Sequence, residues 1–378
     1  MSPAAHHSCA HSIACFISPH GFGHAARAAG VIEAIHQISP ACCFEIFTSV
    51  PSWFFEDSLS APFAYHRIQT DLGLIQKSPF QEDIHETLRR LDTFLPFDPE
   101  RVDALSQTVS RRKCELIICD IAPLGLAVGR RTGIPSVLIE NFTWDWIYQG
   151  YPAVAESMEK HVQYLQRVFR SADYHIQAEP VCRKLPVDLT VSPVSRKCRT
   201  HPAEIRKQLR LPGGKKVVLI TTGGIPDQYG FLSQLADRSD ISFVLPGASR
   251  SVEFSDNLIL LPHRSGFFHP VLVNACDAVV GKVGYSTLAE VYAAGVPFGH
   301  VSRPDFREAR KLAVFIHQEM NGLAIGEVQF YDGSWLSQLP QLLKLSRQQR
   351  RAPNGSDQIA DFICQVGELQ TNENYTDQ

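Results

Sequence analysis

Short apolar runs alternate with helix-spaced apolar positions along most of the chain. In the first half, the runs at 12–18, 42–48, 114–120 and 136–140 read as strands, and 24–37 carries helix-spaced Ala, Val and Ile. Further helical patterns cover 81–95, 99–112, 123–131 and 154–170. Apolar runs that alternate with helices are typical of a parallel sheet covered by helices on both faces.

The same alternation restarts after 186–200, a segment with Pro, Ser, Arg and Lys and no sustained apolar period. The later strands are expected at 215–221, 241–245, 258–261, 278–281 and 298–301. The length also exceeds the usual size of one core. We therefore expect an α/β chain with two doubly wound, Rossmann-like halves that face each other across a cleft. The expected parts are a first domain over 1–190, a second over 200–350, and a C-terminal part, 351–378, with a helix that crosses back and a polar tail.

The stretch most typical of a ligand site is 281–290, GKVGYSTLAE, which follows an apolar run and opens a helical pattern. Its glycines, including Gly284, allow the backbone to approach a ligand closely. Ser286 and Thr287 place hydroxyls beside the free N–H groups of a helix start, where the helix dipole favours an anion. Lys282 adds a cation before that start. The chemistry indicates a phosphate group.

Glu290 follows Thr287 by three residues and therefore shares its helix face. A ligand whose phosphates met Thr287 would place a sugar hydroxyl against this carboxylate. The alternative is a plain strand-to-helix turn, with Ser and Thr as caps and a solvated glutamate. The residues alone leave both interpretations open.

This stretch resembles the donor-binding signature of glycosyltransferases with the GT-B fold, roughly H-C-G-W-N-S-x-x-E followed by G-V-P. The matching residues are Gly284, Tyr285, Ser286, Thr287 and Glu290, with Gly295-Val296-Pro297 at the end. Lys282 stands where that family has a phosphate-binding His, which changes the hydrogen-bond donor but keeps a positive charge. The Thr-x-x-Glu spacing is also similar to the bacterial enzyme that adds N-acetylglucosamine to the lipid-linked peptidoglycan precursor.

A first glycine loop, 20–24, follows the first strand and carries the expected catalytic chemistry. Gly23 and His24 match the Gly-His of GT-B families, where that His often removes a proton from the acceptor hydroxyl. Asp120 ends another strand and resembles the family's Asp that holds the His through its other ring nitrogen. His20 is a rival base. A packing or phosphate-contacting role for His24, and a helix cap for Asp120, are the alternatives.

Three further matches to the family are looser. Gly223-Gly224 resembles its second glycine loop, which admits the diphosphate, and a tight turn is the alternative. His263, ahead of Phe267-Phe268, resembles the segment that contacts the nucleotide base, whereas the phenylalanines fit a core equally well. Asp305 and Glu308 stand where the family often has acidic or amide residues on the donor sugar, with a solvated loop as the alternative.

The whole chain resembles one branch of these enzymes, the glycosyltransferase-like domain at the front of plant arabinose kinases and its stand-alone bacterial relatives. The residues that carry this resemblance are 21–27, 71–76, 141–148 and 281–285, in both halves of the chain. No G-x-x-x-x-G-K-[ST] loop is present, so kinase activity is not carried over. The aromatic run within 141–148 is suited to stacking on a sugar, but core packing is the more common fate.

The resemblance implies an inverting, metal-independent glycosyltransferase that moves a sugar from a nucleotide-diphosphate sugar, a UDP-sugar by preference, to an unidentified hydroxyl acceptor, with no other cofactor. The sequence contains no D-x-D, the motif with which other glycosyltransferases hold a metal-bound diphosphate. The helix start with Lys282 is expected to replace it. A nucleotide-sugar 2-epimerase and a non-catalytic nucleotide-sugar-binding protein remain as alternatives, the latter because of the departure at Lys282.

The composition limits the classes of partner that we expect the protein to bind. A formal charge of −3 offers no general electrostatic footprint for nucleic acid. No apolar run reaches the ~20 residues needed to cross a bilayer, although the aromatic residues 53–55 allow a weak peripheral membrane contact or a place in the core.

The cysteines and the N-terminus bear on the compartment. The ten Cys residues form no C-x-x-C pair, and Cys42-Cys43 reads as adjacent buried thiols in a reducing, cytoplasmic setting. The first eleven residues have no basic region typical of a secretory signal. Their metal-ligand types are His6, His7, Cys9 and His11, for which a flexible terminus is the preferred interpretation.

Overall fold

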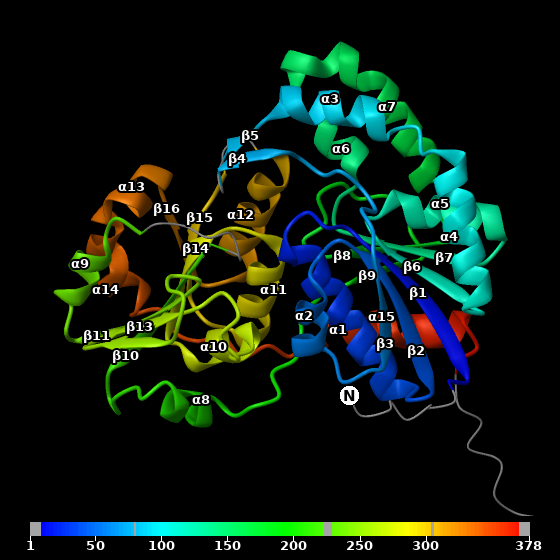
Figure 1. Ribbon diagram of the computed structural model, residues 1–378. Coiled ribbons are helices and arrows are strands. Elements are labelled where there is room, and N and C mark those ends of the chain that lie inside the picture. The colour runs from blue at the N-terminus through cyan, green and yellow to red at the C-terminus, as the bar shows by residue number, and fades with distance from the viewer. Residues whose placement is uncertain (1–8, 79–80, 223–228, 304–305, 370–378) are drawn as a thin grey trace, which may run out of the picture.

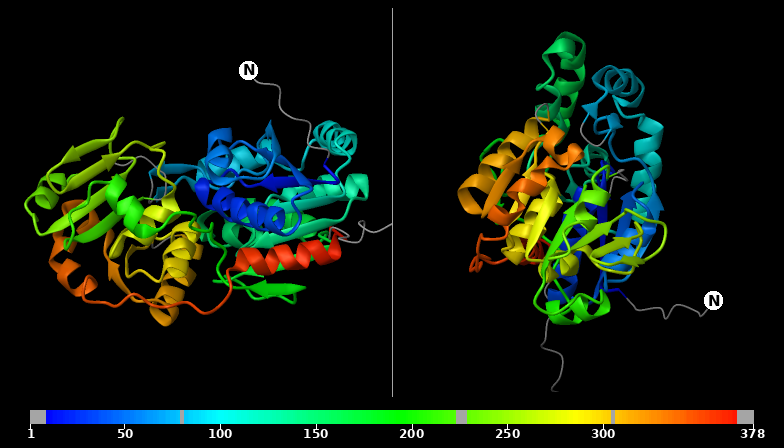
Figure 2. Two further views of the ribbon diagram at one scale, coloured as in Figure 1. Left: turned by 90° about the horizontal axis from the view of Figure 1, so that it is seen from below. Right: turned by 90° about the vertical axis from the view of Figure 1, so that its left-hand side faces the viewer.

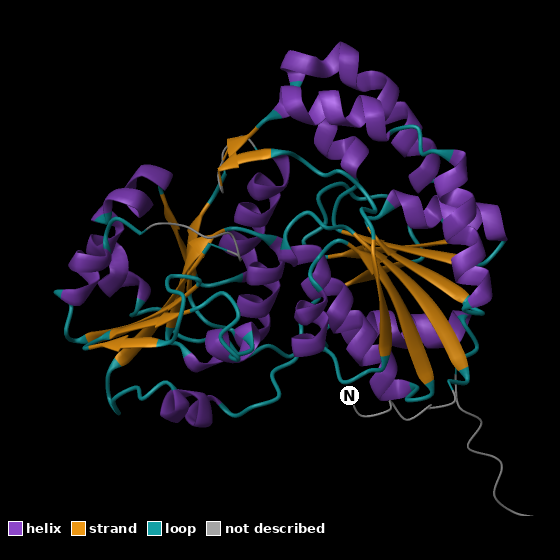
Figure 3. Ribbon diagram, in the orientation of Figure 1, coloured by secondary structure: helices purple, strands orange, loops and turns teal. Residues whose placement is uncertain are grey.

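Two parallel sheets form two lobes that lie side by side (Figure 1). The computed structural model describes residues 9–78, 81–222, 229–303 and 306–369. In each lobe the sheet is sandwiched between helices, as Figure 3 shows in purple and orange. The α/β architecture with two Rossmann-like halves is confirmed.

The first lobe is built on a seven-stranded parallel sheet in the order β3-β2-β1-β6-β7-β8-β9. Its strands are β1 His11–Ile17, β2 Cys42–Thr48, β3 Phe63–Arg67, β6 Leu116–Asp120, β7 Ser136–Glu140, β8 Tyr174–Ala178 and β9 Leu189–Val191. In the register of β1 with β6, Ile17 is opposite Asp120. The loops that follow these two strands therefore leave the sheet side by side.

Helices cover both faces of this sheet and enclose two separate hydrophobic cores. They are α1 Phe22–Ile38, α2 Ser52–Ser58, α3 Ile84–Phe94, α4 Pro99–Arg111, α5 Pro123–Thr132, α6 Trp144–Tyr148 and α7 Ala155–Phe169. A small antiparallel ribbon, β4 Gln76–Ser78 and β5 Gln81–Glu82, lies outside the sheet. The helix expected over 81–95 begins later because its first residues form β5 and Asp83 caps α3, its side chain accepting from the backbone N–H of Glu86.

The second lobe is also built on a seven-stranded sheet, in the order β12-β13-β11-β10-β14-β15-β16. In this sheet β12 alone is antiparallel to its neighbour. Its strands are β10 Lys216–Thr221, β11 Ile241–Pro246, β12 Glu253–Ser255, β13 Leu258–Leu261, β14 Ala278–Lys282, β15 Phe298–Val301 and β16 Gly322–Ile325. Its helices are α8 Pro202–Gln208, α9 Leu232–Ala236, α10 His269–Ala275, α11 Tyr285–Ala294, α12 Arg307–Glu319, α13 Glu327–Asp332 and α14 Leu339–Leu342.

The lobes are joined by two crossings of the chain. The expected linker, 186–200, contains β9 at the edge of the first sheet, so the crossing begins after Val191. The last helix, α15 Gly355–Val366, returns to the first lobe and packs beside α1, as the red helix in the left view of Figure 2 shows. No helix in the described part of the chain is long and apolar enough to cross a membrane.

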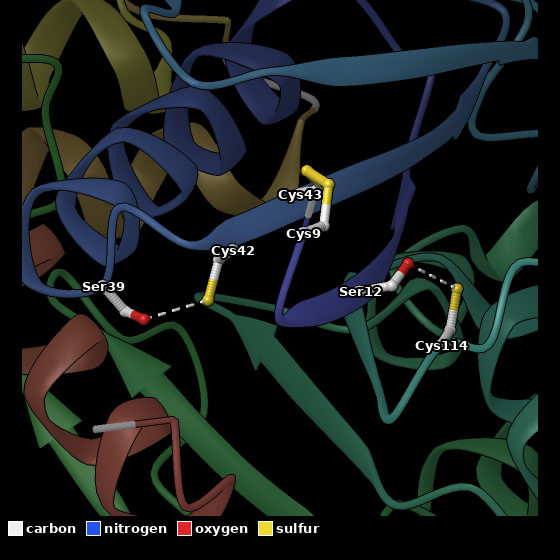
Figure 4. Close-up of a disulfide and its surroundings, with 6 residues drawn as sticks. All are labelled: Cys9, Ser12, Ser39, Cys42, Cys43 and Cys114. Atoms are coloured by element: carbon white, nitrogen blue, oxygen red, sulfur yellow. Dashed lines mark hydrogen bonds between the residues drawn. A yellow bond between two sulfur atoms is a disulfide. The ribbon is translucent and has the colours of Figure 1, made fainter. Parts of the chain in front are cut away.

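The cysteine prediction needs a correction. Cys43 forms a disulfide with Cys9, with the Cα atoms 5.7 Å apart (Figure 4). Successive side chains of a strand point to opposite faces, so Cys42 enters the core and bonds to Ser39 while Cys43 turns the other way. Of the expected pair of adjacent thiols, only Cys42 is free. His11 contacts Glu115, and His6 and His7 lie outside the described residues.

Candidate active site

The first wall of the site is the start of α1, which follows β1 through the glycine loop. His24, in the first turn, lies against the end of β6, and its Nδ1 donates to Asp120 Oδ1 over 3.1 Å. His24 is 6% exposed and Asp120 is 1% exposed. Because Nδ1 carries the proton in this bond, the Nε2 atom is left as a proton acceptor.

Arg27 completes this wall, one turn after His24 on the same face of α1. Its Nε donates to Asp120 Oδ2 over 2.7 Å, and its Nη2 donates to Asp120 Oδ1 over 2.8 Å. Its Nη1 donates to Asn141 Oδ1 over 2.7 Å. Burial by itself would raise the pKa of Asp120, but the charge of Arg27 and the hydrogen bonds from His24 and Arg27 hold that pKa below its usual range. Asp120 is therefore a carboxylate that orients the imidazole.

His20, the rival base, has a different environment. Its Nδ1 accepts from the backbone N–H of Leu74 over 3.4 Å, so the proton of the neutral ring is on Nε2. Burial, followed by the nearby His24, Arg303 and Lys282, lowers the pKa of His20 well below its usual value. His20 thus offers no open acceptor nitrogen, whereas His24 does.

The second wall is the start of α11. Gly284 precedes the helix in extended conformation and has no side chain, so it cannot cap the first backbone N–H groups of the helix. Ser286 and Thr287 occupy the first turn, and Lys282 is the last residue of β14. A Cβ atom on Gly23 would lie 3.7 Å from Ser286 Oγ, so the two walls face each other at this point.

Gly281 has a different role from the one expected. A side chain there would overlap the backbone of Thr221 on the neighbouring strand β10, whereas Gly284 has open space around its Cβ position. Gly281 is therefore required for strand contact rather than for approach to a ligand.

Glu290 is neither solvated nor free. Its Oε1 accepts from Arg196 Nε and Nη2 over 3.1 and 2.9 Å, and its Oε2 bonds to His269 Nδ1 over 2.6 Å. Burial would raise the pKa of Glu290, but Arg196 and His269 lower it. The Arg196 guanidinium also lies over the rings of Phe54 and Phe268, 4.9 and 4.7 Å from their centroids. This carboxylate is held by the segment that joins the domains.

Two cavities meet at the start of α11. The larger, of about 250 Å³, has aromatic walls from both domains, including Phe22, Trp53, Phe54, His263, Phe267 and Phe268. The smaller, of about 90 Å³, contains the polar groups His20, His24, Lys282, Arg303 and Glu308. Phe22, Ser286 and Thr287 line both. A ligand at the α11 start would extend into each cavity.

Most of the site residues predicted from the sequence line one of these two cavities. His263 and Glu290 lie in the larger one. Gly23, His24, Lys282, Gly284, Tyr285 and Glu308 lie in the smaller one. Gly223, Gly224 and Asp305 lie outside the described residues.

Glu308 is buried rather than on a solvated loop, and its Oε1 accepts from Asn141 Nδ2 over 2.8 Å. Because Asn141 belongs to the first domain and Glu308 to the second, this bond joins the two domains. The arginines Arg27, Arg196 and Arg303 were not predicted. The one available signal was the spacing of Arg27 from His24 on one helix face.

The aromatic segments mainly build the core. Trp144 and Trp146 are buried, and Phe142 lines the smaller cavity. Phe55 is buried in the first domain, whereas Trp53 and Phe54 line the larger cavity opposite His263. These side chains face the protein interior or the site.

Known proteins resemble this chain in sequence and in fold. No protein-family model matches the chain. The chain is 25% identical over 358 residues to the L-arabinokinase of Arabidopsis thaliana. The aligned region covers 93% of this chain and 34% of the arabinokinase. The chain thus spans about a third of the length of that relative.

Solved structures extend the likeness over whole chains. The glycotransferase of kitacinnamycin superposes with a TM-score of 0.62 at 15% identity, covering 94% of this chain and 98% of that one. A UDP-glucosyltransferase from Polygonum tinctorium gives 0.58 at 12% identity, covering 95% and 98%. The two Rossmann-like lobes therefore have the GT-B fold, the fold of these glycosyltransferases.

Proposed function

We propose that this chain is a glycosyltransferase that transfers a sugar from a nucleotide-diphosphate sugar, a UDP-sugar by preference, to a hydroxyl acceptor, with inversion and without a metal ion. The observation that carries the proposal is the meeting of the two cavities at the α11 start, opposite the His24–Asp120 pair. The named activities of the structural neighbours agree with this reaction class.

The donor would be held from the second domain. Its diphosphate fits the α11 start, because uncapped N–H groups, the helix dipole, the hydroxyls of Ser286 and Thr287, and the Lys282 charge all favour an anion there. The nucleotide base then extends into the larger cavity beside His263 and the aromatic side chains. The sugar extends into the smaller cavity toward His24.

The transfer step follows from the His24 geometry. The acceptor hydroxyl loses its proton to His24 Nε2 as its oxygen bonds to the anomeric carbon, and the bond from that carbon to the diphosphate oxygen breaks. The leaving diphosphate keeps the electron pair, stabilised by the α11 start. Asp120 stabilises the imidazolium that forms. A single displacement of this kind inverts the anomeric centre.

The first experiment measures the thermal stability of the purified protein with UDP, GDP, dTDP and CDP and their sugars. A ligand that binds only the native state raises the melting temperature. We expect a rise for one nucleotide that is smaller in Lys282→Ala and unchanged in Lys207→Ala, an exposed lysine of α8. No rise with any nucleotide would contradict the donor site.

Turnover separates the reaction classes. Incubation of the stabilising nucleotide sugar with and without a panel of hydroxyl acceptors should release nucleotide mainly when an acceptor is present. Conversion of the sugar without an acceptor would instead indicate the 2-epimerase, and binding without any conversion would indicate a non-catalytic protein.

A further inference from the structure

A ribbon of the first domain reaches the second domain at the smaller cavity. Figure 1 shows β4 and β5 between the two lobes. Glu82, on β5, accepts through Oε1 from Arg303 Nη1 over 3.1 Å. The side chain of Arg303 is 6% exposed and that of Glu82 is 5% exposed. A buried ion pair of this kind fixes the Arg303 guanidinium from the opposite domain.

Arg303 keeps donor capacity that no described residue uses. Its Nε is buried and has no hydrogen-bond partner among the described residues. The guanidinium lies over the Phe306 ring, 3.8 Å from the centroid, and the residue lines the smaller cavity. Gln76 of β4 lines the same cavity and is paired with Glu82 in the ribbon register. An unused buried N–H group costs stability, which a bound ligand atom would recover.

We propose that Arg303, oriented by Glu82, is a specificity-determining residue that binds hydroxyl oxygens of the donor sugar, and that this subsite takes an uncharged sugar. The inference rests on the proposed function, because it assigns the sugar end of the donor to the smaller cavity. The β4–β5 ribbon is then a part of the donor subsite supplied by the first domain.

The balance of charge in the described part of the cavity supports an uncharged sugar. Lys282 lies beside the α11 start, where the diphosphate would be, which leaves Arg303 as the cation near the sugar. Glu82 balances the charge of Arg303 from outside the cavity lining, and one carboxylate, Glu308, lines the cavity itself. A sugar hydroxyl accepts from an arginine N–H and donates to a carboxylate, so it fits such a mixture. A sugar carboxylate would meet the like charge of Glu308 beside an arginine that Glu82 already neutralises, and would be disfavoured.

The test compares the dissociation constants of UDP, UDP-glucose, UDP-galactose and UDP-glucuronic acid by calorimetry. The wild-type protein should bind at least one neutral UDP-sugar ~10-fold more tightly than UDP, the gain typical of a hydrogen bond to a charged group. It should bind UDP-glucuronic acid more weakly than that neutral sugar. If the thermal panel selects another nucleotide, its corresponding sugars are used.

Arg303→Met keeps an unbranched apolar stem over Phe306 but removes the donors. We expect the advantage of the neutral sugar over UDP to disappear in this variant, while the dissociation constant of UDP itself stays within about twofold. Arg351→Met, at an exposed arginine, is the matched control and should change neither value. Glu82→Gln, which keeps the shape of the side chain, should reduce the same advantage and provides a second variant if Arg303→Met does not fold.

Each other outcome counts against the inference. An unchanged sugar advantage in both Arg303→Met and Glu82→Gln would remove Arg303 from the subsite. Tighter binding of UDP-glucuronic acid than of the neutral UDP-sugars would contradict the proposal that the subsite takes an uncharged sugar. Equal weakening of UDP and UDP-sugar would place Arg303 in nucleotide binding. Absence of any nucleotide binding to the wild-type protein would instead overturn the proposed function, and this inference with it.

Discussion

The two walls of the site treat polar groups in opposite ways. In the first wall, both oxygens of Asp120 and the guanidinium nitrogens of Arg27 have protein partners around His24. In the second wall, α11 begins after Gly284, which has no side chain to cap it, and faces both cavities. A fully bonded network fixes one proton acceptor in place, whereas uncapped N–H groups remain available to an anion. The first wall is suited to chemistry and the second to binding.

The largest expected effect separates these two roles. His24→Ala removes the proton acceptor, so the rate of sugar transfer should fall by ~10²–10⁴-fold. Thermal stabilisation by the donor should persist, because the α11 start is untouched. His317→Ala, at an exposed histidine of α12, is the control. Transfer at the wild-type rate in His24→Ala would show that the base lies elsewhere.

Breaking the network of the first wall should cost stability as well as activity. Asp120→Asn leaves Arg27 buried without its charge partner, and the free energy of unfolding should fall by ~3–5 kcal/mol, as measured by urea denaturation at pH 7. A loss below about 1 kcal/mol would mean that the network does not hold the wall together.

The same carboxylate predicts a pH dependence. Because the folded pKa of Asp120 lies below the unfolded value of ~3.9, its stabilisation is complete above that value and is lost as the pH falls through the folded pKa. The stability difference between wild type and Asp120→Asn should therefore shrink in strong acid. A constant difference down to the lowest pH at which both variants fold would contradict this origin.

Asp71 provides a contrast with Asp120, because it is a buried carboxyl with no cation partner among the described residues. It accepts from Trp144 Nε1 over 3.1 Å, and burial raises its pKa to about 7. The contribution of protonated Asp71 to the free energy of unfolding is complete below the unfolded pKa of ~3.9. This contribution is lost as the pH rises toward 7.

Asp71→Asn cannot lose a proton, so its stability relative to wild type should rise by up to ~1.4 kcal/mol per pH unit across that interval. Urea denaturation at pH 5 and pH 8 measures the difference. A difference that does not change with pH would show that Asp71 is not protonated in the folded protein at pH 5.

The smallest expected effect concerns the seam between the walls. The hydroxyl of Tyr285 accepts from the backbone N–H of Val194 over 3.1 Å and donates to the carbonyl of Glu179 over 3.2 Å. Tyr285→Phe leaves both backbone groups without this partner and should lower the free energy of unfolding by ~1–2 kcal/mol. Unchanged stability in urea denaturation would indicate that the seam is held by the apolar contacts of the ring alone.

The central strands were predictable because each is buried on both faces. The apolar runs that became β1, β2, β6, β7, β10 and β14 have little polar content to obscure them. Phe63–Arg67 and Tyr174–Ala178 were missed, since both mix polar and apolar residues. Residues 81–82 were taken for helix because the apolar period of α3 extends into them, whereas pairing with β4 decides their conformation.

For the site, the sequence by itself determined which loops are candidates for chemistry, because a glycine loop after a strand and a Ser-Thr helix start have local signatures. It placed His24 in the loop after one strand and Asp120 at the end of another, and the parallel sheet then brings the ends of those strands together. Only the tertiary structure decided the partners of the buried charges. Arg27 with Asp120, Arg196 with Glu290, and Arg303 with Glu82 join residues far apart in the chain. The physical reason is that a buried charge must find a counter-charge in space, and sequence spacing carries no record of which distant side chain provides it.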